Sequence, residues 1–297
     1  MIKLHLSPED SITESLKSYS FDEHITLYLR DGIYHEKLYL YHHHLSIIGE
    51  SLNGTIISYG DYAYKMHEDG LLYNTFRTST VTVLGHHVHL ENLTIENTSG
   101  SGFTIGQAIA LSLYGDQSRV ISCRLLGNQD TLFLGPLPND LCERYEGFLK
   151  PEQLINKPLV HYLESCVILG NVDFIFGSGT AIFNRCHIIS TGKGFIAAPS
   201  TDCMTSIGFV FYQSVIENQD ISAMILARPW RECGSTHFID CTFLGHFSKE
   251  RYDTWNKENY RFFESPYISS PFSRELIEEE KGQLIDLVNH YAAVPKK

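Results

Sequence analysis

Ser122-Cys123-Arg124-Leu125-Leu126-Gly127 is matched, 43 residues later, by Ser165-Cys166-Val167-Ile168-Leu169-Gly170. The cysteine of each stretch, Cys123 or Cys166, is called its anchor. Alternating apolar positions and a closing glycine follow the anchor, and this pattern is typical of a short, half-buried strand. Five further copies of the pattern are Leu45-Ser46-Ile47-Ile48-Gly49, Leu93-Thr94-Ile95-Glu96-Asn97, Cys186-His187-Ile188-Ile189-Ser190, Ser214-Val215-Ile216-Glu217-Asn218 and Cys241-Thr242-Phe243-Leu244-Gly245. The smallest step between anchors is 20 residues, from Cys166 to Cys186. A unit of this length, with irregular insertions and few helix signals, predicts an all-β solenoid of the parallel β-helix type.

The anchor position is small or apolar in every copy, so we expect it to point inward and to stack as a ladder. Four of the seven cysteines stand there and are expected to act as small buried hydrophobes: Cys123, Cys166, Cys186 and Cys241. An odd number of cysteines without CxxC spacing argues against a zinc site and a disulfide framework, and it agrees with a reducing compartment. No role is assigned to Cys142, Cys203 or Cys233.

Both ends of the chain carry helix signals. Ser7-Pro8-Glu9-Asp10 has the form of a capping box and precedes Ile12 and Leu16 on one helical face. Residues 273–292 mix charge with Leu276, Ile277, Leu284, Leu287 and Val288. We expect short helices that cap the open terminal coils of the solenoid. No Pro/Gly/Ser-rich linker appears, so residues 1–297 are expected to form a single domain.

The formal net charge of −12 argues against nucleic acid as a partner. No stretch is apolar for long enough to span a membrane, and a membrane is not expected as a partner. The N-terminus, Met1-Ile2-Lys3-Leu4-His5-Leu6, has no apolar signal core, so we expect a cytoplasmic monomer, or a secreted protein if a leader has been removed.

Two acidic residues stand at the same offset behind the two matched strands. Asp130 lies in Gly127-Asn128-Gln129-Asp130-Thr131-Leu132 and Asp173 in Gly170-Asn171-Val172-Asp173-Phe174-Ile175, each seven residues beyond its cysteine anchor. If the strands stack as neighbours, the carboxylates lie about 4.8 Å apart. Such a pair cannot easily ionise together, so one tends to keep a proton. An isolated Asp at the end of a strand is usually a turn residue, but the matched offset favours a two-carboxylate hydrolase.

Five motif blocks, in order, identify a resemblance. They are Gly32-Ile33-Tyr34-His35-Glu36, Gln107-Ala108-Ile109-Ala110-Leu111, Gln129-Asp130-Thr131-Leu132, Asp173-Phe174-Ile175-Phe176-Gly177 and Leu226-Ala227-Arg228-Pro229-Trp230. From about Ser11 to Phe263 the chain resembles pectin methylesterases, carboxylesterases that demethylate polygalacturonate on a right-handed parallel β-helix. The resemblance implies methylated galacturonan or oligogalacturonide as the substrate and no cofactor.

The resemblance also implies a role for each of six residues. Asp173 would be the nucleophile that forms an acyl-enzyme, and Asp130 the acid that protonates methanol and then the base that activates water. Gln107 and Gln129 would donate to the oxyanion. Arg228 would hold Asp173 ionised, and Trp230 would stack on a sugar ring.

Other interpretations remain open. A polygalacturonase-type glycosidase shares the solenoid and paired carboxylates, an esterase could act on another acyl group, and a carbohydrate-binding β-helix could lack turnover. The side chains of Gln107 and Gln129 could instead form hydrogen bonds with the backbone, and Trp230 could belong to the hydrophobic core. Histidines in 42–44 and 86–89 could suggest a metal, but three in a row cannot converge in a strand, and no metal is expected. Tyr34 and Glu36 are interpreted as structural.

Three features depart from the family pattern: the segment between the two aspartates is long, Ala227 stands where Gly is usual, and no leader is visible. The 43 residues from Asp130 to Asp173 are more than the family leads us to expect, and the segment up to about His161 is predicted to be an inserted surface loop. The acidic balance predicts a preference for highly methylated substrate, unless the cleft is locally basic. An intracellular enzyme would meet short oligogalacturonides rather than polymer.

Overall fold

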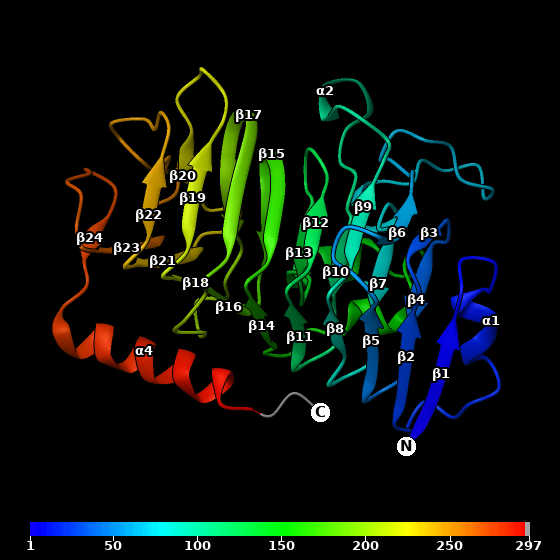
Figure 1. Ribbon diagram of the computed structural model, residues 1–297. Helices are drawn as coiled ribbons and strands as arrows, with labels where there is room; N and C mark the ends of the chain where they lie inside the picture. The colour runs from blue at the N-terminus through cyan, green and yellow to red at the C-terminus, as the bar shows by residue number, and fades with distance from the viewer. Residues whose placement is uncertain (295–297) are drawn as a thin grey trace.

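The chain winds into stacked coils of short strands, which the computed structural model describes over residues 1–294 (Figure 1). The ladders between neighbouring coils are parallel. This arrangement confirms the prediction of an all-β parallel β-helix. None of the helices in the described part of the chain has the length and apolar character needed to span a bilayer.

Sheet A forms one wall of the solenoid and contains one strand from each coil. Its strands, in spatial order, are β1 (Ile2–Leu6), β2 (Ile25–Leu29), β5 (Leu45–Gly49), β8 (His89–Glu91), β11 (Ser118–Ile121), β14 (Val160–Glu164), β16 (Thr180–Asn184), β18 (Phe209–Tyr212), β21 (Ser235–Ile239), β23 (Arg261–Ser265) and β24 (Arg274–Glu275).

The other two walls are joined into one sheet, because the long strands β15 (Val167–Gly177) and β17 (His187–Pro199) pass through both. Wall B contains their first halves together with β3 (Gly32–Tyr34), β6 (Thr55–Tyr59), β9 (Thr94–Asn97), β12 (Arg124–Leu126), β19 (Val215–Asn218) and β22 (Thr242–Leu244). Wall C contains their second halves together with β4 (Leu38–Leu40), β7 (Val81–Val83), β10 (Leu111–Leu113), β13 (Leu132–Leu134) and β20 (Ile225–Ala227).

The anchor residues form an inward ladder at the corner between sheet A and wall B. Cys123, Cys166 and Cys186 are buried in the main core, and Cys241 packs against it. The residue before each anchor turns the chain with a left-handed φ between 48° and 57°, at Asn92, Ser122, Ser165, Arg185, Gln213 and Asp240. One copy of the pattern was misplaced: Leu45–Gly49 is β5 of sheet A, because alternation with a closing glycine also fits that wall.

A short helix, α1 (Ile12–Leu16), covers the N-terminal end, and it buries Ile12 and Leu16. Its N-cap is Ser11 rather than Ser7, because the Ser7–Asp10 segment forms its own turn. The Glu36 carboxylate accepts hydrogen bonds from Ser11 Oγ and from two amides of the first turn. The Tyr34 hydroxyl donates to the carbonyls of Leu6 and Arg30. The structural interpretation of Tyr34 and Glu36 is therefore confirmed.

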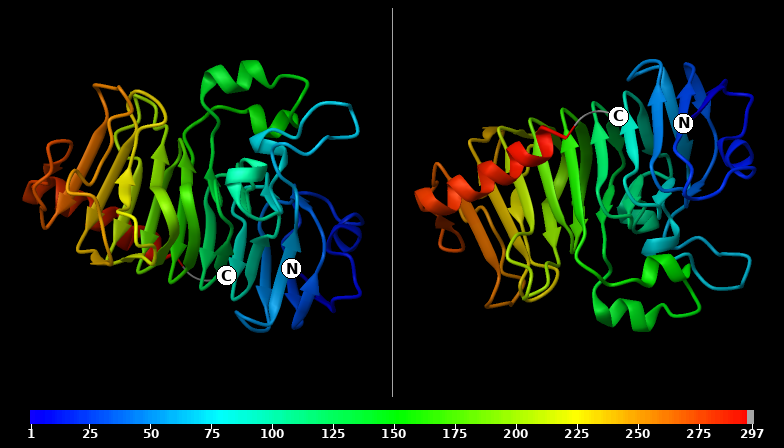
Figure 2. Two further views of the ribbon diagram at one scale, coloured as in Figure 1. Left: turned by 90° about the horizontal axis from the view of Figure 1, so that it is seen from above. Right: turned by 90° about the horizontal axis from the view of Figure 1, so that it is seen from below.

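The C-terminal helix α4 (Glu278–Ala292) does not cap the last coil. It lies along the outside of sheet A (Figures 1 and 2). Leu284 and Val288 pack on outward residues of the sheet, namely Ile121, Tyr162, Ile182, Val210 and Ile239. The prediction of a capping role was wrong because these outward positions are apolar and need a cover of their own.

Two cysteines without an assigned role form a disulfide. Cys203 and Cys233 are 30 residues apart in the sequence and are joined by stacking of the loops that follow β17 and β20. The expectation that no cysteines pair was wrong, because spacing along the chain does not report which turns of a solenoid are neighbours. The pair also removes the argument from cysteine content for a reducing compartment.

Candidate active site

A cleft opens on the outer surface of wall C. We call it the catalytic cleft, and its lining is Thr75, Phe76, Gln107, Gln129, Asp130, Leu141, Arg144, Tyr145, Asp173, Phe176, Ala198, Trp230, Arg231 and Trp255. Five of the six residues predicted from the sequence line it, and the sixth, Arg228, is bonded to Asp173. The structure therefore brings all six together.

The two carboxylates occupy equivalent positions on adjacent coils. Leu126 pairs with Leu169 before them, and Leu132 pairs with Ile175 after them, so the same register holds on both sides. The Asp130 amide donates to the Val172 carbonyl at 3.1 Å. Asp130 and Asp173 both have left-handed backbone conformations, with φ of 62° and 48°, which Asp tolerates better than most residues. The turn that this conformation makes brings each carboxyl group to the cleft.

Arg228 holds Asp173 through two parallel hydrogen bonds. Its Nε donates to Oδ1 at 2.9 Å and its Nη2 donates to Oδ2 at 2.5 Å. The guanidinium carbon lies 3.8 Å from the ring centroid of Phe195 and 3.9 Å from that of Trp255. These two rings and the carboxylate fix the guanidinium plane, so the orientation of Asp173 is fixed as well.

The surroundings separate the protonation states of the two carboxyl groups. Burial, and then the charge of Asp173, raise the pKa of Asp130 well above its usual value, although Arg228 and Gln129 lower it. Burial also raises the pKa of Asp173, and hydrogen bonding and charge from Arg228 oppose that rise. The sequence pattern indicates the neighbouring carboxylate as the cause of the raised pKa of Asp130. In the structure burial is the larger cause, because only 7% of the residue is exposed. Asp130 is thus suited to hold a proton while Asp173 is ionised.

Gln107 and Gln129 come from neighbouring coils at the entrance to wall C. The Gln129 carbonyl accepts from the Ala108 amide at 3.2 Å, and the Gln107 carbonyl accepts from the Ala63 amide at 2.9 Å. The short helix α2 (Gly102–Ile105) packs on Gln129 so closely that a Cβ at Gly102 would lie 2.5 Å from the Gln129 Cβ. A side chain at position 102 would therefore displace Gln129, which lines the cleft together with Gln107.

The segment between β13 and β14, residues 135–159, is not the surface loop that we predicted. It contains α3 (Asn139–Arg144) and the 3₁₀ helix η2 (Pro151–Leu154), and it projects from the solenoid (Figure 2). We call it the insertion. Its apolar residues Leu137, Leu141, Tyr145 and Leu149 form a second core with aromatic residues of wall C. The insertion folds because these side chains recur at helical spacing, and it supplies one wall of the catalytic cleft.

Trp230 lies between the insertion and wall C. Its ring packs edge-on against Phe176, with the centroids 5.8 Å apart, and the Arg231 guanidinium lies 4.7 Å from the Trp230 centroid. Arg231 also forms an ion pair with Asp140 of α3. Trp230 is partly buried but still lines the cleft, so it both packs and faces the opening.

Sequence reasoning missed Trp255, which lies in the long connection between β22 and β23. The chain returns because the Asp253 amide donates to the Ala227 carbonyl at 3.1 Å, and this places Trp255 on Arg228. The chain has two tryptophans, and both line this cleft. A tryptophan in the polar segment 253–259 could have been recognised as a surface aromatic of the kind that binds sugars.

The histidines form stacks along sheet A. The rings of His24, His44 and His87 lie parallel on successive coils, with centroids 4.4 and 4.9 Å apart, and His43 stacks on His86 at 5.0 Å. Within residues 1–294, no three His, Cys, Asp or Glu side chains are placed to hold a metal ion.

Comparisons with known proteins agree with this site. The family model described as Pectinesterase matches residues 9–136 and 153–262, and it leaves out all of α3 and the start of η2. Pectinesterase 31 of Arabidopsis thaliana is 31% identical over 277 residues, which cover 86% of this chain and 80% of that protein. The chain spans 37% of another relative from the same plant, "Probable pectinesterase/pectinesterase inhibitor 64", at 29% identity.

Among solved structures, pectin methylesterase from Yersinia enterocolitica is similar, with a TM-score of 0.75 and 26% identity. The match covers 92% of this chain and 96% of that one. The family model covers most of the solenoid, including both carboxylate turns. The chain belongs to the pectinesterase family.

Proposed function

We propose that this protein hydrolyses methyl esters of galacturonate units in pectin and releases methanol. The observation that carries the proposal is the pair of in-register carboxylates, Asp130 and Asp173, of which only Asp173 is held by a bidentate arginine. An ester hydrolase whose nucleophile and general acid are both carboxyl groups needs one of them ionised and the other protonated at the same bond.

In the first half-reaction, an Asp173 oxygen attacks the ester carbonyl. Negative charge develops on the carbonyl oxygen, where the side-chain amides of Gln107 and Gln129 donate hydrogen bonds. The bond to the methoxy oxygen then breaks, Asp130 gives its proton to that oxygen, and methanol leaves. The product of this half-reaction is an anhydride between Asp173 and the galacturonate carboxyl.

In the second half-reaction, Asp130 is ionised and accepts a proton from water. The hydroxide attacks the anhydride, the bond to the Asp173 oxygen breaks, and a free galacturonate carboxyl is formed. Asp130 is again protonated and Asp173 is again the carboxylate that Arg228 binds. Trp230 and Trp255 line the cleft, where their indole rings can contact the sugar rings of the substrate.

A glycosidase is less consistent with this geometry. A glycosidase also uses two carboxyl groups, but it has no need for two side-chain amides beside them, nor for an arginine that occupies both oxygens of one carboxylate. A carbohydrate-binding protein without turnover would not need the different protonation states. We also propose that the protein acts as a monomer, and on oligomers rather than polymer if it stays in the cytoplasm.

Incubation with methylated galacturonate oligomers separates these functions. Release of methanol without new reducing ends supports the esterase, whereas new reducing ends without methanol would assign a glycosidase. Asp173→Asn should abolish methanol release while the thermal transition stays sharp. An unchanged rate in this variant would exclude Asp173 as the nucleophile.

A further inference from the structure

A second pocket lies beside the catalytic cleft, and the proposed mechanism does not use it. We call it the basic pocket. Its lining includes Lys37, Tyr39, Tyr73, Arg77, Phe148 and Lys150. Among the residues that the structure describes, no carboxylate lines it. Three cations therefore line one pocket in a chain whose net charge is −12.

Each of the three cations in the basic pocket lies on an aromatic ring. Lys37 Nζ is 4.7 Å from the Tyr73 centroid, the Arg77 guanidinium carbon is 3.5 Å from the Phe148 centroid, and Lys150 Nζ is 5.8 Å from the Tyr39 centroid. The rings hold the cations in place, and the cations can bind the carboxylate of a sugar acid. The combination therefore fits a uronate.

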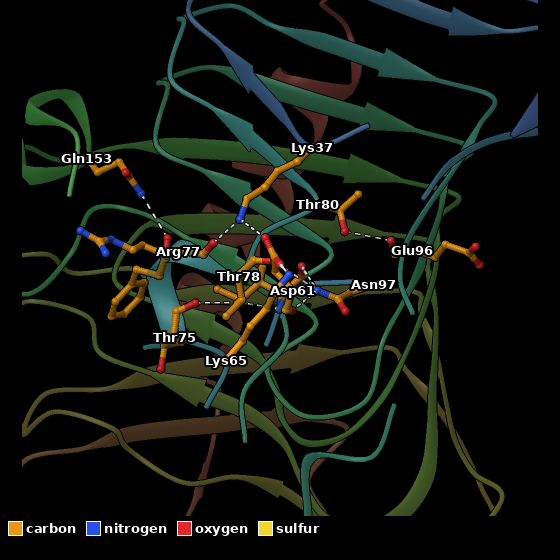
Figure 3. A network of polar contacts seen from close by, with 12 residues as sticks. Lys37, Asp61, Lys65, Thr75, Arg77, Thr78, Thr80, Glu96, Asn97 and Gln153 are labelled. Carbon is orange, nitrogen blue, oxygen red and sulfur yellow. Dashed lines mark hydrogen bonds and ion pairs between the residues drawn. The ribbon is translucent and has the colours of Figure 1, made fainter. Parts of the chain in front are cut away.

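A buried network fixes the position of Lys37. Its ammonium donates to the Asp61 carboxylate and to the Arg77 carbonyl (Figure 3). Asp61 is 1% exposed, and it also forms an ion pair with Lys65. Two lysines on one buried carboxylate leave an excess positive charge at this end of the pocket.

Lys150 differs from the other two cations because it has no carboxylate partner among residues 1–294. Arg77 is paired with Asp69, and its remaining donors bind the Phe148 carbonyl. Lys150 stands at the start of η2 in the insertion and keeps its ammonium available. It is therefore the group that a ligand carboxylate would meet.

The basic pocket and the catalytic cleft are built from the same two segments. The 3₁₀ helix η1 (Thr75–Arg77) lines the cleft with Thr75 and Phe76 and the pocket with Arg77. The insertion lines the cleft with Tyr145 and the pocket with Phe148 and Lys150. The basic pocket is therefore adjacent to the cleft in which the galacturonan chain would react.

We propose that the basic pocket binds the free carboxylate of a galacturonate unit that is already de-esterified. This inference rests on the proposed function and deepens it, because it makes a demethylated unit a recognition element for demethylation elsewhere. The ligand carboxylate belongs either to a remote unit of the reacting chain or to a separate acidic oligosaccharide. The overall charge still disfavours polyanions, and the basic pocket is the local exception that the sequence left open.

The test compares the protein with Lys150→Gln on two substrates of equal length, one fully methylated and one half de-esterified. The measured quantity is the ratio of KM for the half de-esterified oligomer to KM for the fully methylated one. The loss of a partly exposed ion pair should raise this ratio about three- to tenfold. Lys3→Gln, which removes an exposed charge from β1, is the matched control and should leave the ratio unchanged.

Calorimetry with unmethylated trigalacturonate distinguishes the two sources. A higher KM ratio, with trigalacturonate binding unaffected by Lys150→Gln, places the carboxylate on the reacting chain. An unchanged ratio with weaker trigalacturonate binding in Lys150→Gln places it on a separate oligosaccharide. If neither quantity differs from the wild-type value, the inference is overturned. A wild-type protein that releases no methanol would refute the proposed function, while calorimetry would still decide the pocket.

Discussion

Replacement of Arg228 by lysine keeps the positive charge but removes the fork that aims Asp173. The two parallel hydrogen bonds to the Asp173 oxygens cannot both be kept in their present geometry, and the flat group between Phe195 and Trp255 becomes a tetrahedral ammonium. Loss of one hydrogen bond between charged groups costs about 1.5–3 kcal/mol. If that interaction aligns the nucleophile in the transition state, kcat for methanol release falls about 10- to 100-fold.

The pH profile gives a second readout of the same substitution. Arg228 lowers the pKa of Asp173 against the effect of burial. A poorer partner leaves Asp173 protonated to higher pH, so the acidic limb of kcat/KM should move to higher pH in Arg228→Lys. A substitution that merely loosened the fold would lower the rate without this shift.

The assay is methanol release from a methylated oligomer over a range of pH, with the thermal transition recorded for each variant. Arg231→Lys is the control, because Arg231 lines the same cleft but pairs with Asp140 at the exposed rim. That change should cost less than about threefold. Arg228→Lys with kcat within threefold of wild type and an unmoved acidic limb would refute the reasoning.

Three further predictions concern stability. Burial raises the pKa of Asp130 in the folded state, so the contribution of its protonated form to folding stability is complete below the unfolded pKa of about 3.8 and is lost as pH rises through the folded pKa. The free energy of unfolding of Asp130→Asn should therefore increase relative to wild type as pH rises. A difference between the two proteins that stays constant with pH in urea unfolding would contradict this. Cys203→Ser with Cys233→Ser should reduce the free energy of unfolding by about 3–4 kcal/mol, since the disulfide closes a loop of 30 residues; equal urea midpoints for the double variant and wild type would exclude the bond. Leu284→Ala on α4 should cost about 2–5 kcal/mol, because this side chain is 4% exposed against sheet A; a thermal transition unchanged from wild type would show that α4 does not pack there.

The sequence was most informative where local pattern and tertiary position coincide. The anchors Cys123, Cys166 and Cys186 predicted a ladder because strand alternation forces one face inward, whatever the loops between them do. The same argument placed Asp130 and Asp173 together, since an equal offset from two paired strands gives equal positions on the solenoid. Five motif blocks then supplied the remaining residues of the site.

The sequence was least informative where a contact depends on how distant turns meet. Trp255 reaches Arg228 only because its segment folds back onto β20, and no periodicity reports that return. The disulfide between Cys203 and Cys233 has the same cause. The insertion was taken for a loop because its apolar residues are spread over short helices, and their common core becomes visible only against the aromatic residues of wall C.

Carbon-13 NMR of the aspartate carboxyl groups, assigned with Asp130→Asn and Asp173→Asn, tests the central claim most directly. The claim is that two stacked acids hold opposite protonation states because one is buried and the other is bound by Arg228. The account predicts that Asp130 titrates well above 3.8 and at higher pH than Asp173. An Asp130 that ionises before Asp173, or two groups that both titrate at the ordinary value, would contradict it.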